Sequence, residues 1–218
     1  MTYIRDSIHG YIELSDEELS IIDSSEMQRL RRIKQLGLSH LVYPSANHTR
    51  FEHSLGVMHL AGELADSLDL DQKETKTLRI AGLLHDSGHG PFSHASEVVA
   101  ERRGISHEEI SCEVVEKLEN NFSVDAEKVK RTIKGENKIG KVLAGDIDAD
   151  RMDYLVRDAY NSGTEYGNIE YETIIRLAKM YEEEVCFERK AVQSLESLFT
   201  SRFHMIKSLY SHHASRIA

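Results

Sequence analysis

Apolar side chains recur every three to four residues along most of this chain, and this spacing most limits the folds open to it. Leu55, Met58, Ala61 and Leu64 show the interval clearly. Such a period gathers apolar side chains on one face of an α-helix. Because only two prolines interrupt the 218 residues, long helices are sterically possible. The sequence therefore predicts a mainly α-helical domain.

Start and stop signals divide this pattern into separate helices. Ser15 and Ser106 are each followed three residues later by a glutamate, which is the arrangement of a capping box. Gly37 is expected to end a helix. β-Branched and aromatic residues predict short hairpins at residues 3–14 and 184–192. We expect helices within the segments 15–23, 24–37, 54–68, 71–86, 106–119, 126–135, 140–163, 171–184 and 194–218.

Composition limits the domain organisation and the partners. Hydrophobic residues make up 40% of the chain and charged residues 29%, which is typical of one globular domain over residues 1–218. No apolar run is long enough to cross a membrane, and no signal peptide is evident. Two isolated cysteines favour a reducing, cytoplasmic location. The formal net charge of −10 disfavours nucleic acid as a partner.

The stretch HDSGHGPFSH, residues 85–94, concentrates histidines, glycines and a proline where a helix must end. Adjacent residues inside a helix point about 100° apart, whereas at a helix terminus the backbone can turn His85 and Asp86 toward one ion. His53 and the carboxylates of the DIDAD stretch, residues 146–150, are further candidate ligands. Two imidazoles with two carboxylates suit a divalent ion such as Mn, Fe or Zn.

Taken one at a time, these residues have simpler explanations. His53 alone would be an exposed helix-cap residue, and His85 with Asp86 a surface helix end. Asp146 and Asp148 are most simply helix N-caps. The metal-site interpretation rests on their combination in one chain.

Blocks of sequence that span nearly the whole chain carry a family resemblance: DSIHGYIEL, QRLRRIKQLG, NHTRFEHSLGV, LLHDSGHGPFSH, SHEE, DIDADRMDYLVRDA and FTSRFHMIKSLYSHH. In these blocks the chain resembles the HD-domain metal-dependent phosphohydrolases. Within them it is similar to the dNTP triphosphohydrolase branch that includes the sterile-alpha-motif/HD enzyme. The resemblance implies a helical HD-domain fold with small β-hairpins. It also implies C-terminal truncation relative to longer members, because the last helical pattern stops at Ala218.

The resemblance also implies roles for individual residues. A centre for one divalent ion (Mn, Fe, Zn, Mg or Ni) would have the ligands His53, His85, Asp86 and Asp150. The implied catalytic residues are His89, His94, Glu97, His107 and Glu108. The implied substrate contacts are Gln35, Leu36, Arg50, Arg151, Tyr154, Asp158, Arg202, Tyr210 and His212. Without the resemblance, Leu36, Tyr154 and Tyr210 would be assigned to the helical core, and His107 with Glu108 to a helix start.

The implied activity is metal-dependent hydrolysis of deoxynucleoside triphosphates to deoxynucleoside and triphosphate. The partners expected are a nucleotide substrate and a possible homo-oligomer, without a membrane. One alternative is an HD-type phosphohydrolase that acts on nucleoside monophosphates or on a signalling nucleotide. An alternative of another class is a non-catalytic regulator that binds nucleotides or nucleic acid.

General-acid histidines lead to a kinetic prediction. We expect the pH–rate profile to have at least one limb with a histidine-like pKa, because unperturbed imidazole titrates near pH 6.5. Initial rates measured between about pH 5 and 8 test this expectation. A flat profile over that range would contradict it.

Overall fold

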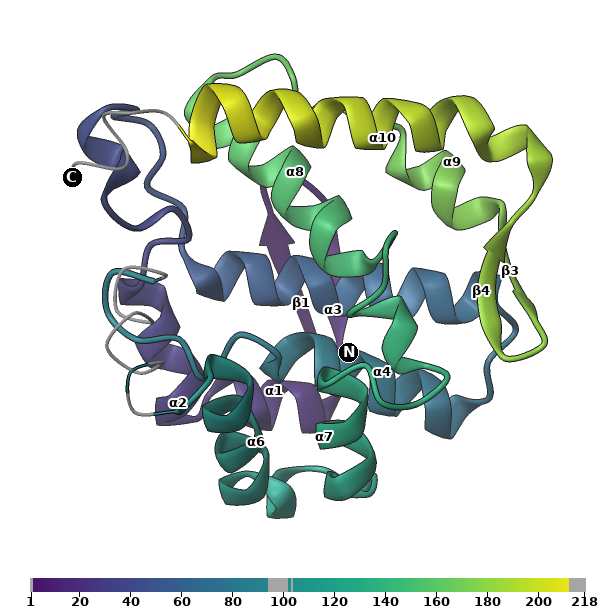
Figure 1. Cartoon of the computed structure of the whole chain (residues 1–218). Coiled ribbons are helices and arrows are strands. Elements are labelled where there is room, and N and C mark those ends of the chain that lie inside the picture. Colours follow the sequence, from purple (N-terminus) through teal and green to yellow (C-terminus); the bar gives the residue numbers. More distant parts are fainter. Residues whose placement is uncertain (1, 94–101, 103, 212–218) are drawn as a thin grey trace.

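Helices α3 (Arg50–Ser67) and α4 (Gln72–Leu84) pack along each other at the centre of the molecule (Figure 1). The computed structural model describes residues 2–93, 102 and 104–211. Within this part the chain is mostly helical with two small antiparallel hairpins, so the predicted fold class is confirmed. No helix among these residues is long and apolar enough to span a bilayer.

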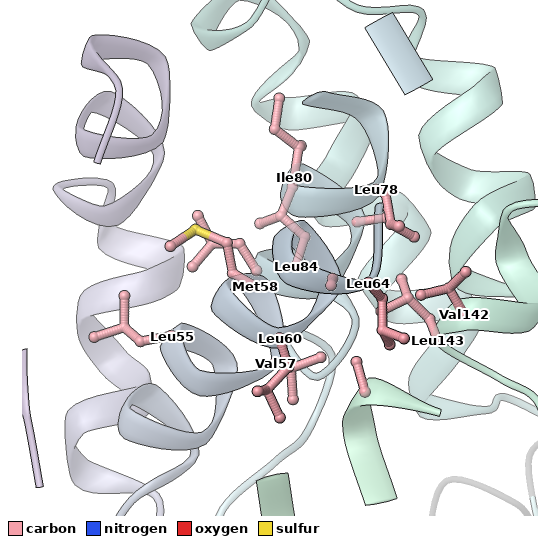
Figure 2. Close-up of a cluster of buried hydrophobic side chains, with 14 of the residues drawn as sticks. Leu55, Val57, Met58, Leu60, Leu64, Leu78, Ile80, Leu84, Val142 and Leu143 are labelled. Carbon is pink, nitrogen blue, oxygen red and sulfur yellow. The ribbon is translucent and has the colours of Figure 1, made fainter. Parts of the chain in front are cut away.

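The buried centre is built around α3, because apolar residues lie on several sides of this helix. Val57, Met58, Leu60 and Ala61 are each 0% exposed. A helix that is apolar on several sides belongs in a protein core. Figure 2 shows side chains of α3 in one cluster with side chains of α4 and of the segment around the 3₁₀ turn η4: Leu78, Ile80, Leu84, Val142 and Leu143.

The other helices surround this central pair. α8 (Ala149–Ser162) packs against α3, and α10 (Val192–Met205) packs on α8 and α9 (Figure 1). α6 and α7 pack against α4. The other α-helices are α1 (Asp16–Ile22), α2 (Ser25–Gln28), α6 (His107–Lys117), α7 (Ala126–Ile133) and α9 (Tyr171–Arg176). The 3₁₀ turns are η1 (Arg29–Arg32), η2 (Gly37–Leu41), η3 (Glu119–Asn121), η4 (Gly140–Val142) and η5 (Arg189–Ala191).

α10 continues directly into one π-helical turn, η6 (Ile206–Tyr210). π-Helical turns are rare and often occur at functional sites. The predicted helix at 194–218 is thus confirmed as far as this turn, and its last residues lie outside the described part of the chain.

Both predicted capping boxes are present. Ser15 Oγ accepts from the Glu18 amide at 3.2 Å, and the Glu18 carboxylate accepts from the Ser15 amide at 2.8 Å. Ser106 and Glu109 make the same reciprocal bonds at the start of α6. These bonds satisfy amides that the first helical turn leaves unpaired.

The N-terminal hairpin lies where the sequence predicted it. β1 (Thr2–Asp6) pairs antiparallel with β2 (Gly10–Leu14), with Ile4 opposite Ile12. The Asp6 carboxylate closes the turn by accepting from the amides of Ile8 and His9, both at 2.9 Å. The turn therefore has a fixed shape that presents the His9 side chain.

The helix predicted at 24–37 is wrong in its second half. α2 ends at Gln28 and the chain passes through η1 into an extended segment, where Lys34 forms a β-bridge with Thr49. The Gln35 amide donates to the His48 carbonyl at 3.0 Å, and the Arg50 amide donates to the Ile33 carbonyl at 2.9 Å. These long-range bonds replace helical bonds, so tertiary pairing overrides local helix propensity.

The helix predicted at 171–184 and the hairpin predicted at 184–192 are both displaced. α9 ends at Arg176, and the hairpin consists of β3 (Ala178–Tyr181) and β4 (Glu184–Phe187). Its two-residue turn has φ values of 49° at Glu182 and 66° at Glu183. Positive φ at both positions suits a tight hairpin turn but is unusual for glutamate. Because the segment lacks the glycine or asparagine typical of such a turn, its sequence predicted a continuing helix instead.

Truncation of the central helix should strongly destabilise the protein. Leu60→Ala is expected to lower the free energy of unfolding by about 2–5 kcal/mol, because Leu60 is 0% exposed in the core. Leu41→Ala is the control, since Leu41 is 65% exposed and should change stability by less than about 0.5 kcal/mol. Urea denaturation of the three proteins measures both values. Equal effects of the two substitutions would contradict the described core.

Candidate metal centre and active-site cavity

The loop after α4 is held in place from two sides. α4 ends at Leu84, and His85 is its C-cap. Ser111 of α6 donates from Oγ to the His85 carbonyl at 2.6 Å and accepts from the Gly88 amide at 2.8 Å. A Cβ at Gly88 would lie 2.0 Å from the His107 carbonyl oxygen, so only glycine allows α6 this close. The Arg29 guanidinium donates to the carbonyls of Ser87 and His89.

The predicted metal ligands come together from α3, α4 with its following loop, and α8. His53 Nε2 lies 3.0 Å from Asp150 Oδ1 and 3.6 Å from Asp86 Oδ2. His85 Nε2 lies 3.5 Å from Asp86 Oδ1 and 3.8 Å from Asp150 Oδ1. Candidate ligand atoms of His53, His85 and Asp86 all lie within 4.8 Å of one another. His53 is 1% exposed, so its interpretation as an exposed cap residue is wrong.

Hydrogen bonds fix which nitrogen of each imidazole faces this cluster. Nδ1 of His85 donates to the Gly82 carbonyl at 2.7 Å, and Nδ1 of His53 donates to Asp153 Oδ2 at 2.8 Å. Each Nε2 therefore faces the carboxylates of Asp86 and Asp150. Histidine ligands of metals are typically oriented in this way, by a bond from the other ring nitrogen.

The histidines and carboxylates of the cluster shift one another's pKa values toward the charged forms. Burial alone would lower the pKa of His53, but its bonds to Asp150 and Asp153 outweigh burial and raise that pKa to about 10. Burial opposes ionisation of Asp86, yet the positive charge of Arg50 and the neighbouring histidines hold its pKa well below the usual range. Burial and the adjacent Asp150 raise the pKa of Asp148 to about 7.

This donor set fits a divalent ion. Nε2 of His85 is buried and has no hydrogen-bond partner among the described residues. It faces two carboxylates, and two imidazoles with two carboxylates suit borderline divalent ions such as Zn, Mn or Fe. Asp148 does not join the cluster: its carboxylate caps α8 by accepting from the Arg151 amide at 2.7 Å. Its interpretation as an N-cap is therefore confirmed.

A cavity of about 720 Å³ opens beside this cluster. Most of the described residues that the resemblance implied as site residues line it: Gln35, Leu36, Arg50, His53, Asp86, His89, His107, Glu108, Asp150, Tyr154, Asp158, Arg202 and Tyr210. Arg202, Ile206 and Tyr210, spaced four residues apart along α10 and η6, form one wall. Leu36, Tyr154 and Tyr210 also pack on the hydrophobic core, so these side chains belong to the core and to the cavity wall at once.

Two implied residues are not on the cavity wall. His85 sits behind Asp86 and Asp150, within the ligand cluster. The Arg151 guanidinium donates to the carbonyls of Gly145 and Asp146, so it braces the turn before α8. Three further implied residues, His94, Glu97 and His212, lie outside the described part of the chain.

Arg50 and Asp158 are anchored deep in the cavity. Arg50 is 2% exposed; its guanidinium pairs with Asp86 and donates from Nε to Ser93 Oγ at 2.8 Å. One terminal nitrogen, Nη2, has no partner among the described residues. Asp158 accepts from the Tyr210 hydroxyl and pairs with His48 Nε2, both at 2.7 Å. The cavity thus contains both a cationic donor and an anionic acceptor.

The two candidate catalytic histidines lie next to the ligand cluster. The rings of His89 and His107 stack with centroids 4.2 Å apart, and His89 Nε2 lies 3.3 Å from Asp86 Oδ1. Burial lowers the pKa of His89 to about 4, although its bond to Asp86 acts in the opposite direction. Stacking connects the N-terminus of α6 to the loop after α4.

The chain was compared with known families. The HD domain model matches residues 50–158, from Arg50 to Asp158, and so includes the whole ligand cluster. The model of the HD associated region matches residues 169–218. The chain belongs to the HD-domain family.

Relatives of this HD-domain chain include proteins of known and unknown activity. It is 46% identical, over 100% of its length, to an uncharacterized protein from Methanocaldococcus jannaschii. It is 35% identical, over 96% of its length, to a deoxynucleoside triphosphate triphosphohydrolase SAMHD1 homolog from Dictyostelium discoideum. The chain spans about half the length of these relatives, 48% and 46% respectively. A phosphohydrolase structure from Bacteroides thetaiotaomicron superimposes with a TM-score of 0.91 at 36% identity, over 98% of this chain and 55% of that one.

Sequence reasoning missed several residues that support the HD centre: Asp6, His9, His48, Asp153 and Arg157. Asp153 and Arg157 follow Asp150 by three and seven residues, so the helical period could have identified them on the same face. His9 and Asp6 gave no such signal, because only tertiary packing brings the hairpin against α8.

Metal binding should stabilise this HD domain. We expect Mn²⁺ added to chelator-treated protein to raise Tm, since a ligand at 100 times its Kd adds about 2.7 kcal/mol of stability, or roughly 2–4 °C per kcal/mol at this size. Asp150→Ala should abolish the shift. Asp146→Ala is the matched control, because Asp146 is exposed on the same loop and should leave the shift intact. A Tm shift that survives Asp150→Ala would argue against this centre.

Proposed function

We propose that this protein hydrolyses deoxynucleoside triphosphates at the α-phosphate to give deoxynucleoside and triphosphate, with one divalent ion as cofactor. The observation that carries the proposal is the 720 Å³ cavity, whose wall combines the ligand cluster with side chains suited to phosphate, sugar and base. Pockets of about 300–1,000 Å³ are typical of small-molecule sites. The named activity of the Dictyostelium discoideum relative, at 35% identity, supports the same substrate class.

His53, His85, Asp86 and Asp150 would hold the ion. A divalent ion at such a site supplies Lewis-acid stabilisation of phosphate charge and lowers the pKa of water. The ligand cluster borders the cavity, so the bond to be cleaved would lie at that end of the pocket.

His89 and His107 are the candidate catalytic histidines beside the departing 5′-oxygen. Because burial lowers the pKa of His89 to about 4, His107 would be the proton donor. Both line the cavity beside Asp86, and Glu108 follows His107 at the same wall. General acid catalysis by a positioned imidazole contributes about 10²–10⁴ to a rate. His94 and Glu97 remain part of the proposal as catalytic residues.

Cationic side chains of the cavity would bind the phosphates. Nη2 of Arg50 is buried without a partner among the described residues, and a phosphate oxygen would satisfy it. Arg202 of α10 also lines the cavity. Arg151 would have to leave the carbonyls of Gly145 and Asp146 to contribute.

The sugar and base would occupy the end formed by α8, α10 and the segment after η1. Asp158 would accept a bond from a 3′-hydroxyl, and Tyr154 would pack beneath the deoxyribose. The rings of Tyr154 and Tyr210 already meet edge to face, with centroids 6.1 Å apart. Gln35 and Leu36 would contact the sugar and base, and Oε1 of Gln35 is buried without a partner among the described residues. His212 completes the proposed substrate contacts.

Product identification tests the activity. Metal-loaded protein is incubated with each dNTP, each NTP and the nucleoside monophosphates, and products are separated by chromatography. We expect deoxynucleoside and triphosphate from dNTPs. Release of orthophosphate or pyrophosphate, or turnover of monophosphates alone, would refute the proposal.

A pair of tyrosine variants tests the cavity itself. Tyr154→Ala should lower kcat/KM for dNTPs by roughly 10²-fold, the size of effect expected when a substrate is misplaced. Tyr160→Ala is the matched control on the same helix, because Tyr160 is 66% exposed and away from the cavity. Unchanged kcat/KM in Tyr154→Ala would mean that the substrate lies elsewhere.

A further inference from the structure

Asp153 of α8 is a fully buried carboxylate that accepts four hydrogen bonds. Its Oδ1 accepts from His9 Nε2 at 2.6 Å and from Arg157 Nη2 at 2.8 Å. Its Oδ2 accepts from His53 Nδ1 at 2.8 Å and from Arg157 Nε at 2.8 Å. Both oxygens are therefore saturated, and the carboxylate has one available orientation.

The donors reach Asp153 from three separate parts of the fold. His9 comes from the tip of the β1–β2 hairpin, His53 from α3, and Arg157 from α8 itself. Asp6 of the hairpin holds Arg157 in turn, with bonds of 2.8 and 3.1 Å. Burial opposes ionisation of Asp153, yet Arg157 and the two histidines hold the pKa of this carboxyl well below its usual range.

The His9 ring is held mainly by its hydrogen bond to Asp153. Its side chain is 1% exposed, and its Nδ1 is buried without a hydrogen-bond partner in the described part of the chain. The bond to Asp153 is thus the polar anchor of the ring. Two aromatic rings lie beside it: His59, with centroids 5.3 Å apart, and Tyr171, which meets it edge to face at 5.5 Å.

Gly56 of α3 supplies an independent indication that the position of Asp153 matters. A Cβ at residue 56 would lie 1.8 Å from Asp153 Oδ1 and 2.5 Å from Arg157 Nη2. The carboxylate is therefore pressed against the backbone of α3, one turn beyond His53. Glycine is required there for Asp153 to reach His53 at all.

We propose that His9 and Asp153 are positioning residues for the metal centre: the hairpin fixes Asp153, and Asp153 fixes the His53 imidazole with Nε2 toward Asp86 and Asp150. The inference rests on the metal centre of the proposed function. The N-terminal hairpin then supports the metal site through Asp153, while no hydrogen bond or ion pair joins its described residues directly to the ligand cluster.

His9 also lies against a second cavity, of about 490 Å³. His9 and His59 line it together with Glu63, Asp66 and Tyr171, and Glu63 and Asp66 are exposed at its rim. The His9 side chain itself is 1% exposed, so a small molecule could take its place only after truncation, as in His9→Ala, by entering from this second cavity. This permits a chemical rescue experiment.

Metal affinity is the primary measurement. Mn²⁺ is titrated into the chelator-treated protein and its variants, and Kd is measured by calorimetry. Asp153→Asn and His9→Ala should each weaken Mn²⁺ binding about 10- to 100-fold, as loss of such supporting residues does at other metal sites. His59→Ala is the matched control: it borders the same cavity next to His9 but makes no bond to Asp153.

Rescue separates positioning from general damage to the fold. Free imidazole should restore Mn²⁺ affinity to His9→Ala, since the vacated space adjoins the second cavity, but should not restore it to Asp153→Asn. His9→Gln, which keeps an N–H donor, should bind Mn²⁺ more tightly than His9→Ala. Failure of both forms of rescue would overturn the role of His9.

Two glycine variants of α3 provide a further comparison. Gly56→Ala should weaken Mn²⁺ binding, because the new Cβ displaces Asp153. Gly62→Ala is the control on the same helix: its Cβ would meet the Arg79 guanidinium at 2.7 Å, away from the ligands. Equal Kd values for these two variants and the unsubstituted protein would overturn the inference.

The outcomes also separate this inference from the proposed function. Tight Mn²⁺ binding that is unchanged in Asp153→Asn refutes the positioning role and leaves the centre intact. If the unsubstituted protein binds no Mn²⁺ or other divalent ion, the centre itself fails, and the inference with it. Tight binding without triphosphate release refutes only the substrate assignment.

Discussion

An ionised carboxylate removed from water is stable only where opposite charge and hydrogen bonds surround it. Asp153 meets this condition with four donors from the hairpin, α3 and α8. Removing one partner of such a buried pair typically costs about 3–5 kcal/mol. The tertiary arrangement of these three elements and the orientation of His53 therefore depend on the same set of bonds. Stability and metal geometry are not separable at this point of the molecule.

The charge of the whole chain is a poor guide to its ligand. The protein is acidic, with a formal net charge of −10, yet the proposed substrate is a polyanion. Inside the cavity Asp86 is paired with Arg50, and Asp158 is bonded to His48 and Tyr210. Arg202 forms no ion pair with any residue that the structure describes. Pairing of Asp86 and Asp158 thus leaves two cationic donors at the pocket: Arg202, and Nη2 of Arg50, which has no partner among the described residues. Glu108 and Asp150 also line this pocket.

Much of the fold was predictable because local signals were strong. The helical period of α3 and the capping boxes at Ser15 and Ser106 depend on neighbours in sequence, and all three were confirmed. The segment at 33–35 was not predictable in this way, because its bonds to residues 48–50 are long-range. The prediction for the β3–β4 segment was wrong for another reason: its two turn glutamates adopt positive φ, which glutamate rarely does.

The candidate site shows the same division. His53, His85, Asp86 and the aspartates at 146–150 were candidates from the sequence itself, and the resemblance selected Asp150 among those aspartates. The support behind them was harder to foresee. His9 is distant from Asp153 in sequence, and nothing in either segment alone shows that the hairpin tip meets α8. Arg151 was implied as a phosphate contact, but its side chain braces a turn because the carbonyls of Gly145 and Asp146 are closer partners.

The π-helical turn η6 changes which side chains can share a wall. In a regular α-helix, residues spaced by four drift around the axis by about 40° at each step. Arg202, Ile206 and Tyr210 nevertheless all reach the cavity, and the last of them bonds Asp158. The widened turn holds one extra residue and so corrects the drift. Regular α-helical winding over the same residues would place Tyr210 about 80° around the axis from Arg202, so the π-turn is what keeps these two side chains on one wall of the cavity.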